Sequence, residues 1–192
     1  MATMLGWDTL KMSENPNQGR RANELGPTGQ QVAANLKRLR AARGLSTTKL
    51  AELLTEEHDR PFTAGAVTRI EHGKRRVDTD DLMALAAALQ VSPSAFLLPP
   101  TAAGEVEVTG LGEVAAHDAW RWVDGQWPPG ASRDPETLRR QLLDFHLHSR
   151  PAGIAPYVDV ERAVRHLADF GETPFEKNQA APPPFGEAPH PD

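Results

Sequence analysis

The sequence contains no cysteine. That absence excludes disulfide bonds, thiolate metal sites and cysteine nucleophiles, and it suits a reducing compartment. Aromatic residues make up only 6% of the 192 residues, and 17 prolines interrupt the chain, so much of it does not belong to one large packed core. No segment approaches the roughly 18 consecutive apolar residues of a membrane-spanning helix, and the first residues do not resemble a signal peptide. We therefore expect a cytoplasmic protein without a membrane span.

The net charge of -5 is distributed unevenly along the chain. Residues 1–27 are neutral overall, residues 28–98 carry a net charge of +2, and residues 99–192 carry a net charge of -7. The acidity therefore belongs to the C-terminal half. The middle of the chain keeps a slight cationic excess, which is compatible with binding to nucleic acid.

Helix signals begin after a stretch rich in Asn, Gly and Pro, so residues 1–27 are interpreted as a flexible leader. Thr28 and Gln31 form a capping box, which predicts that the first helix opens at Thr28. Gly44 predicts its end, because glycine readily adopts the left-handed conformation that closes a helix. Between these signals, apolar residues recur at helical spacing: Val32, Leu36 and Leu39.

Two short helices are predicted next. Ser46 caps a helix over residues 47–55, and Thr63 caps another over residues 64–72. Glu71 falls on the inward face of the latter helix, where an unpaired carboxylate is costly. Arg40 lies beside the apolar stripe of the first helix, so we predict a structural ion pair between Arg40 and Glu71.

Two further helices complete the predicted domain. A fourth helix is expected from Thr79, and a short fifth helix is expected with Ser92 as its cap and Pro93 at its first position. Two consecutive prolines at 99–100 then stop the helix and mark a domain boundary.

This layout resembles the five-helix DNA-binding domain of the lambda repressor and Cro-like family, also called the xenobiotic-response-element family. The resemblance covers residues 30–98, and its signatures are LRAARGLSTTKLAELL, TAGAVTRIEHGKRR and DLMALAAALQVSPSAFLL. The connection TEEHDRPF at 55–62 departs from the family, because it is longer and more acidic than the turn of a few residues usual in this motif. The resemblance implies an all-α fold, with a partly helical and partly disordered C-terminal extension.

By resemblance, the helix after Thr63 lies in the major groove of double-stranded DNA. Four residues are then nearest the bases: Ala64, Gly65, Thr68 and Arg69. Only Arg69 can make the bidentate contact with guanine, which contributes about 1–3 kcal/mol of discrimination. Ala64 and Ala66 can offer only methyl groups, for example to thymine.

The resemblance also implies contacts with the DNA backbone. Five residues are expected to contact phosphates: Ser46, Thr47, Thr48, Lys74 and Arg75. The first three lie at a helix N-terminus, where free N–H groups and hydroxyls favour an anion. Arg76 is less clearly assigned, because it is equally placed to pair with Asp78.

The C-terminal half carries weaker signals. Residues 104–113 are a short strand or an extended linker, and helices are predicted from Asp134 and over 158–170. Either helix could dimerise the protein or bind a partner. The tryptophans of this region either line a ligand pocket or pack onto the helical domain or a second subunit, and packing is favoured: Trp120, Trp122 and Trp127.

No catalytic, metal or cofactor site is expected. His146 and His148 are two residues apart on a predicted helix, so their side chains point in different directions and cannot share one ion. The sequence shows no catalytic triad, carboxylate pair or phosphate-binding loop in suitable surroundings. An enzyme with an attached DNA-binding domain is an alternative, which loss of turnover after truncation at Pro99 would reveal.

These features predict a sequence-specific DNA-binding transcriptional regulator, acting as a homodimer and, in the family's commoner mode, as a repressor. An alternative is an antitoxin-like or other protein-interaction module whose C-terminal half binds a protein partner. Four segments are expected: a leader at 1–27, the helix-turn-helix domain at 28–98, a linker and small helical region at 99–170, and a disordered Pro-rich tail at 171–192.

Overall fold

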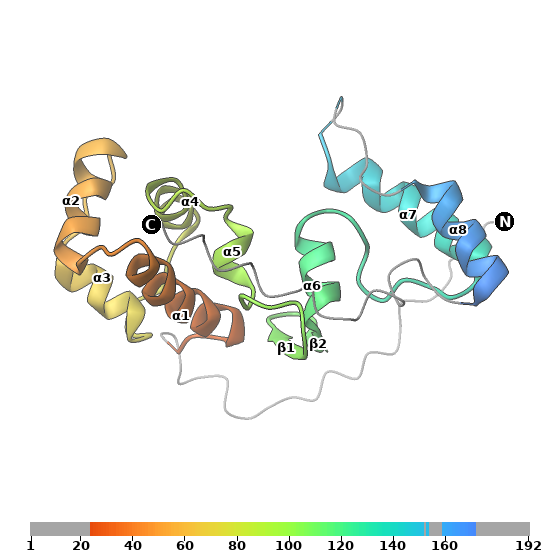
Figure 1. Ribbon diagram of the computed structural model, residues 1–192, viewed down its shortest axis with the longest axis horizontal. Helices are drawn as coiled ribbons and strands as arrows, with labels where there is room; N and C mark the ends of the chain where they lie inside the picture. The colour runs from red at the N-terminus through yellow and green to blue at the C-terminus, as the bar shows by residue number, and fades with distance from the viewer. Residues whose placement is uncertain (1–23, 152, 154–158, 172–192) are drawn as a thin grey trace, which may run out of the picture.

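The computed structural model describes residues 24–151, 153 and 159–171. The predicted leader up to residue 23 and the predicted tail from residue 172 lie outside the described residues. Three neighbouring parts follow one another along the molecule (Figure 1). Helices α1–α5 lie at one end, a β-hairpin with α6 lies in the middle, and α7 and α8 lie at the other end.

The first part consists of five helices: α1 (Pro27–Ala42), α2 (Thr47–Glu57), α3 (Ala64–Glu71), α4 (Thr79–Ala88) and α5 (Ser94–Leu97). The remaining elements are β1 (Glu105–Val108), β2 (Gly112–Ala115), α6 (Ala116–Val123), α7 (Pro135–Ser149) and α8 (Val160–Phe170). The described chain is thus mostly helical. The expectation of an all-α fold is wrong in one respect, because β1 and β2 form a small antiparallel sheet.

The hairpin follows from local sequence. The segment Glu105–Val108 alternates glutamate with valine, a pattern that suits a strand with one face against the protein. Gly110 and Gly112 have φ angles of +89° and +78°, which side chains other than glycine rarely adopt. The turn therefore reverses the chain, and Val108 pairs with Gly112.

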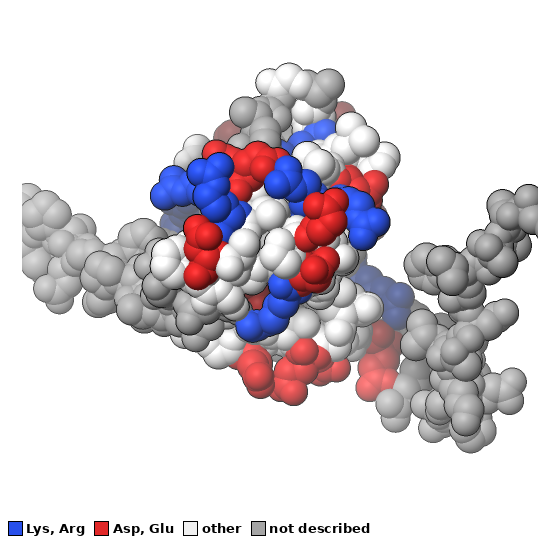
Figure 2. Space-filling view, turned by 90° about the vertical axis from the view of Figure 1, so that its right-hand side faces the viewer, with Lys and Arg blue, Asp and Glu red and all other residues white. Residues whose placement is uncertain are grey.

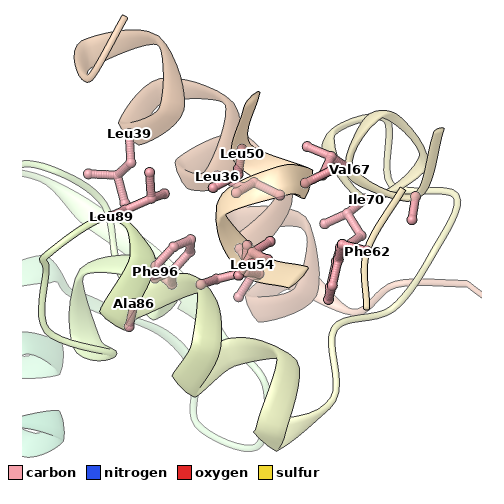
Figure 3. Packing of buried hydrophobic residues seen from close by; sticks show 14 residues of the cluster. Leu36, Leu39, Leu50, Leu54, Phe62, Val67, Ile70, Ala86, Leu89 and Phe96 are labelled. Atoms are coloured by element: carbon pink, nitrogen blue, oxygen red, sulfur yellow. The ribbon is translucent and has the colours of Figure 1, made fainter. Parts of the chain in front are cut away.

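One hydrophobic cluster holds the helical part together (Figure 3). Leu36 from α1, Leu50 and Leu54 from α2, Val67 from α3 and Phe96 from α5 are each fully buried in it. Burying such a side chain contributes about 1.5–3 kcal/mol relative to exposure. The apolar stripes recognised in the sequence therefore converge on one core.

Helix ends in this part follow the predicted capping chemistry. The Ser46 hydroxyl accepts the Lys49 backbone N–H at 3.0 Å, and the Thr63 hydroxyl accepts that of Ala66 at 3.1 Å. Gly44 closes α1 with a φ angle of +65°. These predictions are confirmed, because capping depends on residues that are neighbours in the chain.

Other predicted boundaries are wrong. α1 begins at Pro27 after Gly26, and no side chain caps it, so the predicted capping box is absent. The Thr28 hydroxyl instead accepts the backbone N–H of Thr109 at the hairpin turn, at 3.0 Å. Ser92 does not cap α5 with its side chain, since its hydroxyl bonds that of Ser94. α2 continues two residues beyond the predicted end, to Glu57.

A buried asparagine joins the two ends of the helical part. Asn35 of α1 is 1% exposed, and its amide donates to the carbonyl oxygens of Phe96 at 2.9 Å and Leu98 at 2.7 Å. Its own carbonyl oxygen accepts from the guanidinium of Arg38. Every polar atom of this side chain is therefore satisfied, and the end of α5 is fixed against α1.

The middle part packs onto the helical part. Leu98, Val108 of β1 and Ala119 of α6 form a second buried cluster, with Trp120 and Trp122 against it. The Trp120 indole N–H donates to the carbonyl oxygen of Pro99 at 3.0 Å. These two tryptophans therefore pack back toward the helical domain, as the favoured interpretation expected.

α7 and α8 form a third cluster with Trp127. Leu138 and Leu142 of α7 are fully buried against Val164 and Leu167 of α8. The helix predicted from Asp134 is confirmed, since the Asp134 carboxylate accepts the Thr137 backbone N–H at 2.9 Å. The helix predicted over 158–170 is also present and begins at Val160.

Candidate nucleic-acid interface

The third helix, α3, has one buried face and one exposed face. Ala66, Val67 and Ile70 are buried in the core, whereas Gly65 and Arg69 are exposed. The buried position of Ala66, at 4% exposure, corrects its interpretation as a methyl group offered to thymine. A helix of eight residues is thus held from one side and open to a ligand on the other.

The expected ion pair between Arg40 and Glu71 lies behind α3. The Arg40 Nε atom is 2.6 Å from Glu71 Oε1, and Nη2 is 2.9 Å from Oε2, so the pairing is bidentate. Hydrogen bonding to this carboxylate raises the pKa of Arg40 above its ordinary value. Arg40 Nη1 also donates to the Leu45 carbonyl oxygen at 2.7 Å. The Arg40 side chain therefore connects α1 both to α3 and to the residue that precedes the cap of α2.

The residues expected nearest the bases lie on or beside the exposed face of α3. Gly65 and Arg69 are exposed, while Ala64 and Thr68 are half-buried. The Thr68 hydroxyl donates to the Ala64 carbonyl oxygen at 2.9 Å, so its proton is used within the helix. A Cβ atom at Gly65 would lie 3.7 Å from Arg69 Nη1. The Arg69 side chain therefore extends back along α3 over the surface left free by Gly65.

The N-terminus of α2 supplies the first expected phosphate site. The Ser46 hydroxyl already accepts the Lys49 N–H, and Thr48 is exposed beside it. The first N–H groups of any α-helix lack an acceptor within the helix, and they carry the positive end of its dipole. Ser46, Thr47 and Thr48 therefore lie where an anion is favoured.

The turn after α3 supplies the second expected phosphate site. Gly73 has a φ angle of +67°, and its N–H donates to the Ile70 carbonyl oxygen at 2.9 Å. The Lys74 N–H donates to the Arg69 carbonyl oxygen at 2.8 Å, which completes a Schellman closure. Lys74 is exposed, and no ion pair among the described residues includes it. Its ammonium group is therefore available to a phosphate.

The structure places Arg75 and Arg76 in contacts within the protein. Arg75 Nη2 lies 2.9 Å from Asp81 Oδ2, and its guanidinium lies 4.9 Å from the centre of the Phe62 ring. Arg76 donates to the Glu24 carbonyl oxygen, so the alternative of an Arg76–Asp78 pair is wrong. Of the basic residues in this turn, Lys74 has the fewest competing contacts.

A cluster of charges around the buried carboxylate of Asp81 fixes this turn to α4. Asp81 is 2% exposed and pairs with Arg75 and with Arg60, whose Nε atom is 2.8 Å from Oδ1. Arg60 also contacts Asp78, at 3.1 Å from Nη2 to Oδ1. Sequence reasoning missed this cluster, although an arginine in the long connection and the acidic run at 78–81 were available signals. The connection between α2 and α3 thereby positions the basic turn.

Acid should weaken the contribution of Asp78 to this arrangement. A hydrogen bond from the Asp81 backbone N–H and the nearby Arg60 charge lower the pKa of Asp78 below its ordinary 3.8. A lowered folded pKa means that the stabilisation is complete above the unfolded pKa and is lost as pH falls through the folded pKa. We expect Asp78→Asn, which preserves a helix cap, to be less stable than the parent near neutral pH.

The same two proteins should approach equal stability well below pH 3.8, where the parent's carboxylate is protonated. Urea unfolding midpoints measured at both pH values check this expectation. A stability difference that persists unchanged in acid would show that the charge of Asp78 is not its cause.

Two further kinds of site receive no support. Within the described ranges, no group of three or more His, Asp or Glu side chains is placed to hold a metal ion. His146 of α7 instead bonds the Gln126 carbonyl oxygen through Nε2, at 3.0 Å. In the same part of the chain, no helix combines the length and apolar character needed to cross a membrane.

The paired helices α2 and α3, each capped by a hydroxyl and backed by one core, have the geometry of a helix-turn-helix. A family model described as a helix-turn-helix domain matches residues 31–96, about a third of the chain. This match supports a DNA-binding domain in that segment. Comparison with curated proteins and with solved structures gives no match.

Proposed function

We propose that this protein is a sequence-specific transcriptional regulator of the lambda repressor and Cro-like type. It binds double-stranded DNA as a cytoplasmic homodimer, places α3 in the major groove and represses transcription. The observation that carries this proposal is the two-sided character of α3. Its inner face is buried and backed by the Arg40–Glu71 pair, while Arg69 stands exposed on its outer face.

The exposed face of α3 limits what can be read directly. Arg69 offers the planar fork of donors that matches the O6 and N7 atoms of guanine. The side chain of Ala64 is small and Gly65 has none, so this part of α3 can approach the floor of the groove closely. Ala64 can then contact a thymine methyl group. The remaining specificity then comes from DNA shape and from pairing two half-sites in a dimer.

Phosphate contacts set the register of α3 on the duplex. The helix N-terminus at Ser46, Thr47 and Thr48 and the ammonium group of Lys74 provide them from the two ends of the α2–α3 unit. Arg75 must share its guanidinium with Asp81. We therefore assign Lys74 the larger part of the electrostatic attraction in this turn.

Lys74→Ala should weaken binding to specific and random DNA by similar factors. Loss of one phosphate contact lowers the slope of log affinity against log salt by about 1. Arg75→Ala should change this slope less, because its charge is already balanced by Asp81. Fluorescence anisotropy over a salt series measures both slopes, and an unchanged slope for Lys74→Ala would remove this residue from the interface.

Selection from a random duplex library tests the function as a whole. The full-length protein should enrich a motif made of two related half-sites, since a symmetric dimer reads a symmetric site. Anisotropy against a random competitor at moderate salt then gives the specificity ratio. A folded protein that enriches no motif would overturn the proposal.

A further inference from the structure

α7 has two apolar sides. One side carries Leu138 and Leu142, which are buried against α8. The other side carries Leu143 and Leu147, which are 54% and 73% exposed. A surface helix normally needs only one apolar face. The second side therefore has no counterpart among the described residues and is suited to contact another molecule.

The exposed side has the spacing of a helix–helix contact. Glu136, Arg140, Leu143 and Leu147 follow one another at intervals of four, three and four residues, and all four are exposed. Two helices that pack along a shared seam repeat apolar residues at such intervals, and here the apolar residues are Leu143 and Leu147. In such a seam the leucines are covered by the partner helix, including the aliphatic stems of its charged side chains.

The charges along this seam favour one relative orientation. Arg140 and Asp144 are one helical turn apart on either side of Leu143, and the Asp144 side chain is 78% exposed. In a parallel pair, Arg140 would face Arg140 of the second copy and Asp144 would face Asp144, so like charges would repel. In an antiparallel pair whose two-fold axis passes at the level of residue 142, a residue two positions before 142 faces the residue two positions after 142 in the second copy. Each Arg140 then faces Asp144 of the second copy.

Other charges of the same chain lie around this match. Hydrogen bonds from Thr137 and, to a smaller extent, the charge of Arg140 lower the pKa of Asp134. Arg139 is held by Glu161 of α8, so it belongs to the fold of one chain. His148 lies 3.5 Å from Asp144, but its side chain is 70% exposed and can move aside. Around the α7–α8 end of the molecule, charges of both signs surround an uncharged area (Figure 2). That arrangement suits a partner that itself carries both signs.

We propose that two copies of this chain associate through an antiparallel pair of α7 helices, with Leu143 and Leu147 in the seam and Arg140 of each copy paired with Asp144 of the other. This inference rests on the proposed function in naming the interface of its homodimer. The association is measured without DNA, so a failure to bind DNA and a failure to pair are separate results.

A charge-exchange experiment on the full chain tests the pairing. Sedimentation equilibrium should show a dimer for the parent and, for Arg140→Glu or Asp144→Lys, a dissociation constant raised by about tenfold or more, because like charges then face each other twice. The double variant Arg140→Glu/Asp144→Lys should recover dimerisation, since the opposite charges are restored with exchanged positions. Circular dichroism checks that every variant keeps its helical content.

A variant of one seam leucine, with a control variant of an exposed methionine elsewhere, tests whether the leucines of α7 form the contact. Leu143→Glu should yield a monomer, whereas Met83→Glu on α4, at a site with a nearly equal exposure of 55%, should leave the dimer intact. A monomeric parent, single charge variants that dimerise as well as the parent, or a double variant that stays monomeric would each overturn the proposal. So would a parent whose α7 surface is occupied by a different, co-purifying protein.

Discussion

Arg69→Ala should remove the preference for one guanine in each half-site while leaving binding to random DNA nearly unchanged. Arg69 is exposed on the outer face of α3, and it is the only residue of that face with a bidentate donor fork. Its loss should cost about 1–3 kcal/mol per half-site at the matching position. The Arg69→Ala variant should then bind the selected site and a site in which that guanine is replaced with nearly the same affinity.

Fluorescence anisotropy at one salt concentration measures the affinity of the parent and of the Arg69→Ala variant, each for the selected site and for the site in which the guanine is replaced. Arg165→Ala is a suitable control, because it removes one positive charge at another exposed arginine, on α8. An equal loss of affinity for specific and random DNA would show that Arg69 contacts phosphate and does not read a base.

Arg40→Ala should destabilise the fold by about 3 kcal/mol, the lower end of the range for breaking a buried ion pair. The Glu71 side chain is 7% exposed, so its carboxylate would remain desolvated without its two guanidinium donors. The Leu45 carbonyl oxygen would lose a donor as well. The effect is large because the mostly covered carboxylate left behind loses both of its guanidinium donors.

Urea unfolding of the full chain measures this loss, with Lys37→Ala on the exposed side of α1 as the control, expected within about 0.5 kcal/mol of the parent. The double variant Arg40→Met/Glu71→Leu should be more stable than Arg40→Ala, because no charge is then buried without a partner. If Arg40→Ala were as stable as the control, the pair would contribute nothing to holding α3.

The sequence predicted those features of α2 and α3 that depend on near neighbours. Ser46 and Thr63 were recognisable as caps because the hydroxyl and the N–H that it accepts lie three residues apart. The Arg40–Glu71 pair spans 31 residues, yet it too was predicted. Helical periodicity placed Glu71 on an inward face, and a buried carboxylate requires a cation.

Other features needed contacts between segments that are distant in sequence. Thr28 satisfied every local rule for a capping box, but the hairpin turn brings Thr109 to it from 81 residues away. Arg75 and Lys74 are adjacent basic residues with the same expected role. Only the position of Asp81 beneath the turn separates them, since it neutralises one and leaves the other exposed.

By itself, the sequence determined the caps that begin α2 and α3, the glycine that ends α1, and which apolar residues of these helices form the core. These properties follow from capping and from apolar spacing within a few turns of one helix. The tertiary structure decided which charged side chains remain free for a ligand. That choice depends on where the connection after α2, the start of α4 and the hairpin fold back, because an ion pair forms only between groups that the fold brings within reach.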